Sequence, residues 1–150
     1  MKKFLALLLA LTMALCLAAC GDNSNQPAGS SAAGSGDAAP SVKVGFIMLH
    51  DENSTYDLNF INGAKEACEA LGITDYIIKT NIGENNDCYD AACELVDAGC
   101  GIIFADSFGH EDYMIQAAKE NPDVQFCHST GTKAHTEGLA NYHNAFASIY

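Results

Sequence analysis

From residue 42 onward the sequence predicts an α/β fold built on a Rossmann-like parallel sheet. Short apolar runs alternate with stretches in which apolar residues recur at helical spacing. The connections between them are short, and Ser, Asn, Gly and Pro stand where helices would begin and end. Strands and helices that alternate in this way form right-handed crossovers, which predicts a parallel sheet with helices on both faces.

The first strand is expected at Val42–Leu49, because a nearly continuous apolar run is typical of a strand covered on both faces. Ser54 and Asp57 then have the spacing of a capping box, and Gly72 is a typical helix end. The inward residues of this helix, at helical spacing, would be Leu58, Ile61, Ala64, Cys68 and Leu71.

A second strand is expected at Tyr76–Thr80, followed by a helix that Asn85 or Asn86 caps and Gly99 ends. The inward residues of this second helix would be Cys88, Ala92, Leu95 and Val96.

The third and fourth strands are expected at Gly101–Ala105 and Val124–His128, with a helix over His110–Glu120 between them. Pro122 would end that helix, since proline cannot continue it. All four strands are expected to run parallel. The inward residues of the third helix would be Tyr113, Met114, Ala117 and Ala118.

The pattern weakens beyond Thr130. Residues Gly131–Glu137 resemble a loop, Gly138–Tyr142 a short strand, and Asn144–Tyr150 the start of another helix. This last amphipathic element stops within its pattern, so residues 42–150 are expected to be an incomplete chain that forms one lobe.

The first residues have the features of an export signal. A short positive start and an apolar stretch predict a signal peptide over residues 1–19. Leu17-Ala18-Ala19-Cys20 resembles a bacterial lipobox, at which Cys20 would be lipidated and would anchor the protein to the membrane without spanning it. The alternative is an ordinary cleavage site followed by a stray thiol. Residues 20–41 carry few large apolar side chains, which predicts a flexible tether on the extracytoplasmic face of the cell membrane.

The charge of the chain excludes one class of partner. The formal net charge is −12 and the sequence has no Arg, so nucleic acid is not an expected partner. Five cysteines fall in the folded part, an odd number without a Cys-x-x-Cys pair. Buried free thiols are favoured over a disulfide framework, which stays the alternative.

A ligand site is expected where the parallel strands end, because ligands of open α/β sheets bind outside the carboxyl ends of the strands. The polar loops that follow the four strands supply acceptors, hydroxyls and two aromatic rings, which suits a small neutral polar ligand such as a sugar or a nucleoside. These loops are His50–Tyr56, Asn81–Gly83, Asp106–Gly109 and His128–Gly131.

Four segments carry a resemblance to a known family. They resemble the basic membrane protein family: the apolar strand Val42–Leu49, the turn Ser54–Asp57 that leads into Phe60-Ile61-Asn62-Gly63-Ala64, the strand and loop 101–108, and residues 117–126. These are lipoprotein substrate-binding proteins that include purine nucleoside receptors. The resemblance covers Val42–Tyr150 and implies the N-terminal lobe of a type I periplasmic-binding-protein fold, whose second lobe is missing here. It also implies the substrate-binding subunit of an ABC importer, with a permease and an ATPase as partners.

The resemblance also suggests residues for the site. Family members usually carry Lys-Ser-Phe-Asn in the first loop, with the Phe stacked on the nucleobase; here Tyr56 keeps the ring and Asp57 replaces the amide. The third-strand loop usually has Gly-Phe, where this chain has Ser107 and Phe108, and His128 stands where an Asp often ends the fourth strand. The residues expected to contact the ligand are Tyr56, Asp57, Asp106, Ser107, Phe108 and His128.

Each of these residues also has a structural explanation. Asp57 would serve as the acid of the capping box, and Tyr56 as a hydrophobic staple. Asp106 and Ser107 would cap the third helix, and Phe108 would plug the space between strand end and helix. His128 would be a packed, hydrogen-bonded histidine.

Motifs of catalysis and cofactor binding are missing from the sequence. It has no Gly-x-Gly-x-x-Gly, no P-loop and no Gly-x-Ser-x-Gly elbow. His50, Asp51 and Glu52 are consecutive, and three consecutive residues rarely converge on one metal ion. We therefore expect no cofactor, no metal and no enzyme. The alternative to an importer subunit is an extracellular sensory module that binds a ligand and signals to a membrane receptor.

Overall fold

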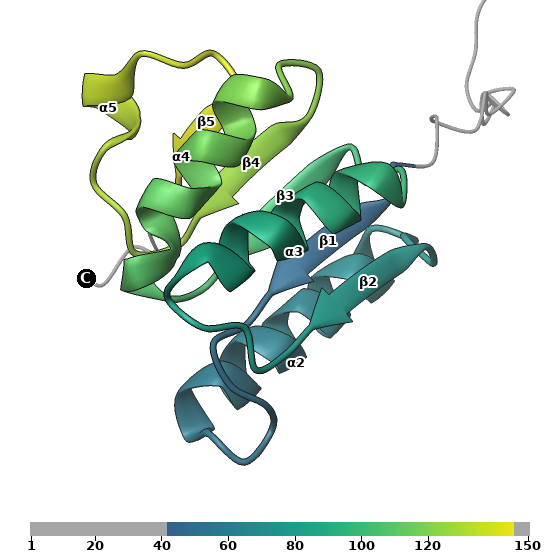
Figure 1. Cartoon of the computed structure of the whole chain (residues 1–150). Helices are drawn as coiled ribbons and strands as arrows, with labels where there is room; N and C mark the ends of the chain where they lie inside the picture. The colour runs from purple at the N-terminus through teal and green to yellow at the C-terminus, as the bar shows by residue number, and fades with distance from the viewer. Residues whose placement is uncertain (1–41, 146–150) are drawn as a thin grey trace, which may run out of the picture. The chain divides into compact units, whose positions relative to one another are not determined.

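Five parallel strands form the centre of the structure, a computed structural model that describes residues 42–145 (Figure 1). Their order is β2-β1-β3-β4-β5, and every neighbouring pair is parallel. The predicted Rossmann-like α/β fold is therefore confirmed. The strands are β1 (Val44–Ile47), β2 (Tyr76–Lys79), β3 (Ile102–Ala105), β4 (Gln125–His128) and β5 (Tyr142–Asn144).

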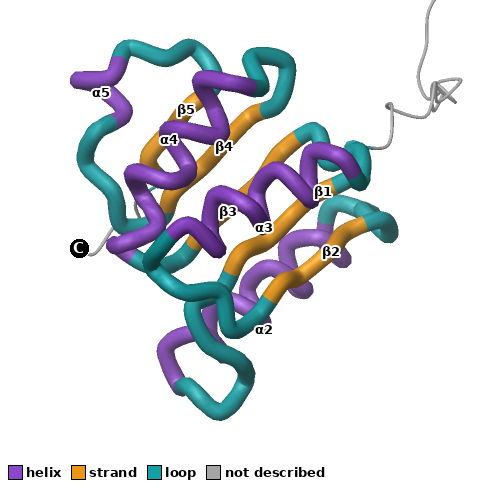
Figure 2. Tube along the Cα trace, viewed as in Figure 1, coloured by secondary structure: helices purple, strands orange, loops and turns teal. Residues whose placement is uncertain are grey.

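The helices divide between the two faces of this sheet. Helix α2 lies on one face, and α3 and α4 lie together on the other (Figures 1 and 2). No helix within residues 42–145 is both long enough and apolar enough to cross a membrane. The helices are α2 (Thr55–Ala70), α3 (Asn86–Asp97), the short 3-10 helix η2 (Phe108–His110), α4 (Glu111–Glu120) and α5 (Ala134–Glu137).

The predicted helix ends of α2 and α3 are found in the structure. The Ser54 and Asn85 side chains accept hydrogen bonds from the first turns of α2 and α3. Gly72 and Gly99 follow these helices with φ of 68° and 86°, the left-handed region that glycine adopts without a steric penalty.

The sheet separates the core into two halves. On the α2 face the buried residues are Val44, Phe46, Met48, Ile61, Ala64 and Cys68. The larger half lies on the side of α3 and α4 and includes Ile47, Leu95, Ile103, Met114, Phe126 and Tyr142. All four residues of β1 are buried, as expected for a central strand covered on both faces.

Several local predictions were wrong. Leu71 is 74% exposed, because α2 ends at Ala70 and the chain turns away at Gly72. The region expected to be a loop contains α5, and the last strand is Tyr142–Asn144 and not Gly138–Tyr142, because Gly138 instead ends α5 with φ of 65°.

Asn144 accordingly ends a strand, where the sequence suggested the start of a helix. The rest of that helix, the signal peptide, the lipidated Cys20 and the tether lie outside the described residues.

Within the described residues, none of the five cysteines is paired. Cys68, Cys88 and Cys100 are buried, whereas Cys93 and Cys127 are half-buried. This agrees with the favoured prediction of free thiols.

Candidate functional site

The carboxyl ends of β3 and β4 meet the first turn of α2 at one backbone carbonyl, that of Asp106. The Tyr56 hydroxyl donates to this oxygen over 3.0 Å, and the Ser129 hydroxyl donates to it over 3.2 Å. Tyr56 stands in α2, Asp106 directly follows β3 and Ser129 directly follows β4. The predicted edge of the sheet therefore brings polar groups from three parts of the chain together.

Asp57 is fully buried at this edge and bonds to several groups of the loop after β1. Its carboxylate accepts the His50 backbone N–H over 2.8 Å and the Ser54 hydroxyl, and His50 Nδ1 lies 3.1 Å away. Burial raises the pKa of Asp57, but the bonds from Ser54 and His50 outweigh it and lower the pKa to about 2. Asp57 is therefore a carboxylate whose bonds hold the loop against α2.

Asp106 is also buried, at 2% exposure, but its pKa is shifted upward. One oxygen, Oδ1, accepts the Leu49 backbone N–H over 3.1 Å, and Oδ2 has no donor near it. Burial, followed by the hydrogen bond to Asp57 and the repulsion from it, raises the pKa of Asp106 to about 7. The two neighbouring carboxyl groups therefore have pKa values shifted in opposite directions.

The two predicted aromatic residues are the most exposed members of the site. Phe108 is 66% exposed, so its ring does not plug the space between β3 and α4. Tyr56 is 49% exposed and its ring lies 4.9 Å from that of Phe60, centre to centre. Both rings are open to solvent and accessible for stacking on a ligand.

Ser107 and His128, in contrast to these rings, are buried. His128 Nε2 donates to the Ser107 backbone oxygen over 2.6 Å, and the His128 side chain is fully buried. Burial lowers the pKa of His128, which favours the neutral ring. His128 therefore fixes the backbone at Ser107 from the interior of the sheet.

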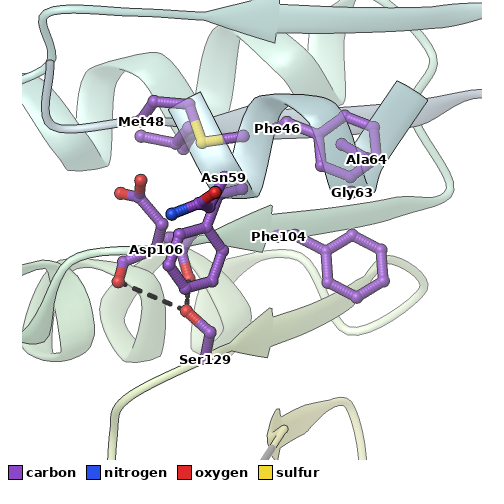
Figure 3. Close-up of a pocket in the computed structure, with 11 residues that line it drawn as sticks. Phe46, Met48, Asn59, Gly63, Ala64, Phe104, Asp106 and Ser129 are labelled. Carbon is purple, nitrogen blue, oxygen red and sulfur yellow. Dashed lines mark hydrogen bonds between the residues drawn. The ribbon is translucent and has the colours of Figure 1, made fainter. Parts of the chain in front are cut away.

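A cavity of about 330 Å³ opens on the α2 face of the sheet, beside this edge (Figure 3). Asp106, Asn59 and Ser129 lie toward one end of it, and the stacked rings of Phe46 and Phe104 lie toward the other. Its size is at the low end of the range of ligand pockets. Of the six predicted site residues, Asp106 alone lines it; the lining residues are Phe46, Ile47, Met48, Asn59, Phe60, Gly63, Ala64, Phe104, Ala105, Asp106 and Ser129.

Sequence reasoning missed three residues that organise the edge. Ser129 was part of a predicted loop but was not chosen as a site residue. Glu84 directly follows the predicted loop Asn81–Gly83, and its carboxylate accepts the Ser107 hydroxyl and the Gly109 N–H. Extending the search for polar residues by one position beyond Gly83 would have found it.

Glu111, the third missed residue, lies behind the edge and is 4% exposed. Its Oε1 accepts the backbone N–H groups of Thr132 and Lys133 over 2.7 and 2.8 Å, and the Tyr142 hydroxyl over 3.2 Å. Burial raises the pKa of Glu111, but these bonds outweigh it and lower the pKa below its ordinary value. Glu111 thus holds the loop after β4 against α4. No sequence signal distinguishes it from an exposed acid in the first turn of a helix.

No cluster in the described part of the chain has the side chains of a metal site: three or more His, Cys, Asp or Glu residues that could converge on one ion do not occur among residues 42–145.

Comparisons with known proteins found similarity both by sequence and by structure. The chain is 34% identical over 119 residues to a purine-binding protein of Brucella abortus, a match that covers 75% of this chain and 33% of that protein. The fold is similar to an ABC transporter solute-binding protein of Conexibacter woesei, with a TM-score of 0.61, 19% identity, and 70% and 35% of the two chains covered. No family model matches the chain.

A second solved structure is a transcriptional activator of the comK gene from Bacillus halodurans, with a TM-score of 0.52, 21% identity, and 59% and 30% of the two chains covered. At these identities both structures show the fold alone. The chain spans about a third of the length of each of these three proteins. It is thus a homologue of the purine-binding protein with the fold of an ABC-transporter solute-binding protein, which confirms the resemblance to the basic membrane protein family.

Proposed function

We propose that this chain forms the first lobe of a substrate-binding lipoprotein, which captures a small polar ligand for an ABC importer at the extracytoplasmic face of the cell membrane. The observation that carries the proposal is the 34% identity to a purine-binding protein over most of the chain. Purine nucleosides are accordingly the first ligands to test, with sugars second. The permease and the ATPase of the importer would be the partners, and lipid on Cys20 the anchor.

The geometry at the carboxyl edge supports capture of a ligand. Two exposed aromatic rings, Tyr56 and Phe108, stand beside the buried polar groups of Asp106 and Ser107. Rings provide a flat apolar surface for a base or a sugar, and the polar groups fix its orientation. Asp57 and His128 would act from behind, by holding the loops that carry these residues.

The geometry of Cys127 and His128 on β4 supports a protein that binds a ligand without turning it over. Cys127 and His128 are neighbours on β4, so their side chains point to opposite faces and do not form a thiolate–base pair. Burial also raises the pKa of the Cys127 thiol, which disfavours the nucleophilic thiolate. Turnover of a ligand bound by the intact protein would contradict this part of the proposal.

A thermal-shift screen of the intact protein tests the proposal. Purine nucleosides at about 100 times Kd should add about 2.7 kcal/mol to the free energy of unfolding, and sugars and small peptides provide the comparison. Tyr56→Ala should weaken binding and leave the unliganded protein about as stable as before, with Asn62→Ala, an exposed position of α2 outside the cavity lining, as the control. If nucleosides cause no shift and another class of ligand causes a clear one, the proposed purine ligand is wrong and the proposed role as a binding protein still holds.

A further inference from the structure

Glu84 is a carboxylate at the carboxyl edge that two hydrogen bonds hold in place. It lies between β2 and α3, and its Oε1 accepts the Ser107 hydroxyl and, over 2.8 Å, the Gly109 backbone N–H. A Cβ on residue 109 would lie 2.4 Å from the Glu84 carboxyl carbon, so this close approach requires the glycine. The bonds from Ser107 and Gly109 hold the pKa of Glu84 below its ordinary value. Glu84 is therefore a carboxylate at neutral pH.

The bond to Glu84 determines what Ser107 offers to a ligand. A hydroxyl has one proton to donate and two lone pairs that accept. The proton of Ser107 is directed to Glu84, so the hydroxyl faces other partners as an acceptor. Tyr56 and Ser129 have the same polarity, because both donate inward to the backbone oxygen of Asp106.

The lysines near this edge do not offset the negative charge. Lys79 ends β2 and pairs with Glu94, and Lys133 follows β4 and pairs with Asp112. Within residues 42–145, each lysine of the carboxyl edge is thus held by a carboxylate of its own. The edge itself carries the carboxylates of Asp57 and Glu84.

We propose that Glu84 is a specificity-determining residue, which makes this site select uncharged or cationic ligands rich in N–H and O–H donors and reject anionic ones such as phosphate esters. Its carboxylate fills the place beside Ser107 and Gly109 that an anion would otherwise occupy. The assignment to ligand selection rests on the proposed binding function, whereas the bonds that Ser107 and Gly109 donate to Glu84 are a property of the chain itself.

Two variants of the intact protein separate charge from structure. Glu84→Gln keeps an acceptor oxygen for Ser107 and Gly109 and removes the charge, whereas Glu84→Ala releases both donors. Adenosine and adenosine 5′-monophosphate are the matched probes, and Kd is measured by calorimetry. The wild type should prefer the nucleoside, and Glu84→Gln should narrow the preference by about tenfold through better binding of the monophosphate.

Glu66→Gln is the control, because Glu66 is an exposed carboxylate of α2 outside the edge, and it should leave the ratio unchanged. If Glu84 had only a structural role, Glu84→Gln would weaken the binding of both probes equally. An unchanged ratio in Glu84→Gln therefore overturns the proposal.

Inorganic phosphate provides a readout that needs no purine binding. Titration of Glu84→Ala with phosphate should shift the NMR signal of the Gly109 amide, and the wild type should show no such shift. If the wild type binds neither purine probe, the proposed purine ligand fails, and the phosphate titration still decides whether Glu84 occupies an anion position. No shift in Glu84→Ala would overturn the proposal.

Discussion

Asp57 and Asp106 show how the surroundings of a residue set its chemistry. Both are aspartates, both are buried, and they interact with each other. Asp57 receives hydrogen bonds from His50 and Ser54, which lower its pKa, whereas Asp106 receives one backbone N–H and its pKa is raised. The number of donors that each carboxyl group receives thus separates the pKa of the aspartate after β3 from that of the aspartate in the first turn of α2.

This pair predicts an unusual dependence of stability on pH. The pKa of Asp106 is raised to about 7 in the folded state, so between its unfolded value of 3.8 and pH 7 the folded state binds more protons than the unfolded one. Its contribution to the free energy of unfolding therefore falls as pH rises through that window, by up to ~1.4 kcal/mol per pH unit. Asp57 has the opposite sign, since its contribution is present above 3.8 and is lost as pH falls toward 2.

Asp106→Asn removes the titrating group and keeps a side chain of similar size. Urea unfolding at pH 5 and pH 8 should show the variant gaining stability relative to the wild type as pH rises. Comparing differences between the two proteins cancels the contributions of the other titrating groups. A difference that is independent of pH would show that Asp106 is already ionised at pH 5.

At the scale of elements, the loop between β4 and α5 is placed by side chains and not by regular structure. Glu111 of α4 accepts the N–H groups of Thr132 and Lys133, and Asn144 of β5 accepts the N–H of Ala134 over 2.8 Å. Gly131 lies in the middle of this loop, where its backbone comes close to Glu111 and His128. A Cβ there would lie 2.2 Å from Glu111 Oε1 and 2.5 Å from His128 Nδ1.

Gly131→Ala should therefore destabilise the protein by roughly 1–3 kcal/mol, the usual cost of overpacking a filled site. Gly63→Ala is the matched control, because a Cβ at this position of α2 meets nothing within 4 Å. Alanine in a helix interior should instead stabilise by roughly 0.5–1 kcal/mol. Denaturant unfolding of both variants measures the contrast, and equal effects would contradict the packing described around Glu111.

At the scale of the whole molecule, this chain spans about a third of its relatives. Two-lobed binding proteins close on a ligand by hinge motion, with contacts from each lobe. The exposed rings of Tyr56 and Phe108 agree with a site that a second lobe completes.

Residues 42–150 alone should accordingly bind any ligand of the intact protein orders of magnitude more weakly, at tenfold per ~1.4 kcal/mol of lost contact. Calorimetry on the fragment and on the intact protein, with the same nucleoside, measures the ratio. Circular dichroism of the fragment confirms that it is folded. Equal affinities would show that one lobe is sufficient.

The sequence by itself determined the order and the approximate bounds of the first four strands and three helices. Apolar periodicity, Ser54, Asn85, Gly72 and Gly99 are local signals, and local signals survive without tertiary contacts. It also placed the candidate site at the carboxyl edge, because parallel connectivity alone brings those loops together.

Tertiary structure decided the rest. The bond of Glu84 to Ser107 joins residues 23 apart in sequence, and that of Glu111 to Tyr142 joins residues 31 apart. The opposite pKa shifts of Asp57 and Asp106 likewise depend on two buried carboxyl groups that come together from different elements. Periodicity carries no information on such pairs, because burial and charge at a site are set by residues that come together only when the chain is folded.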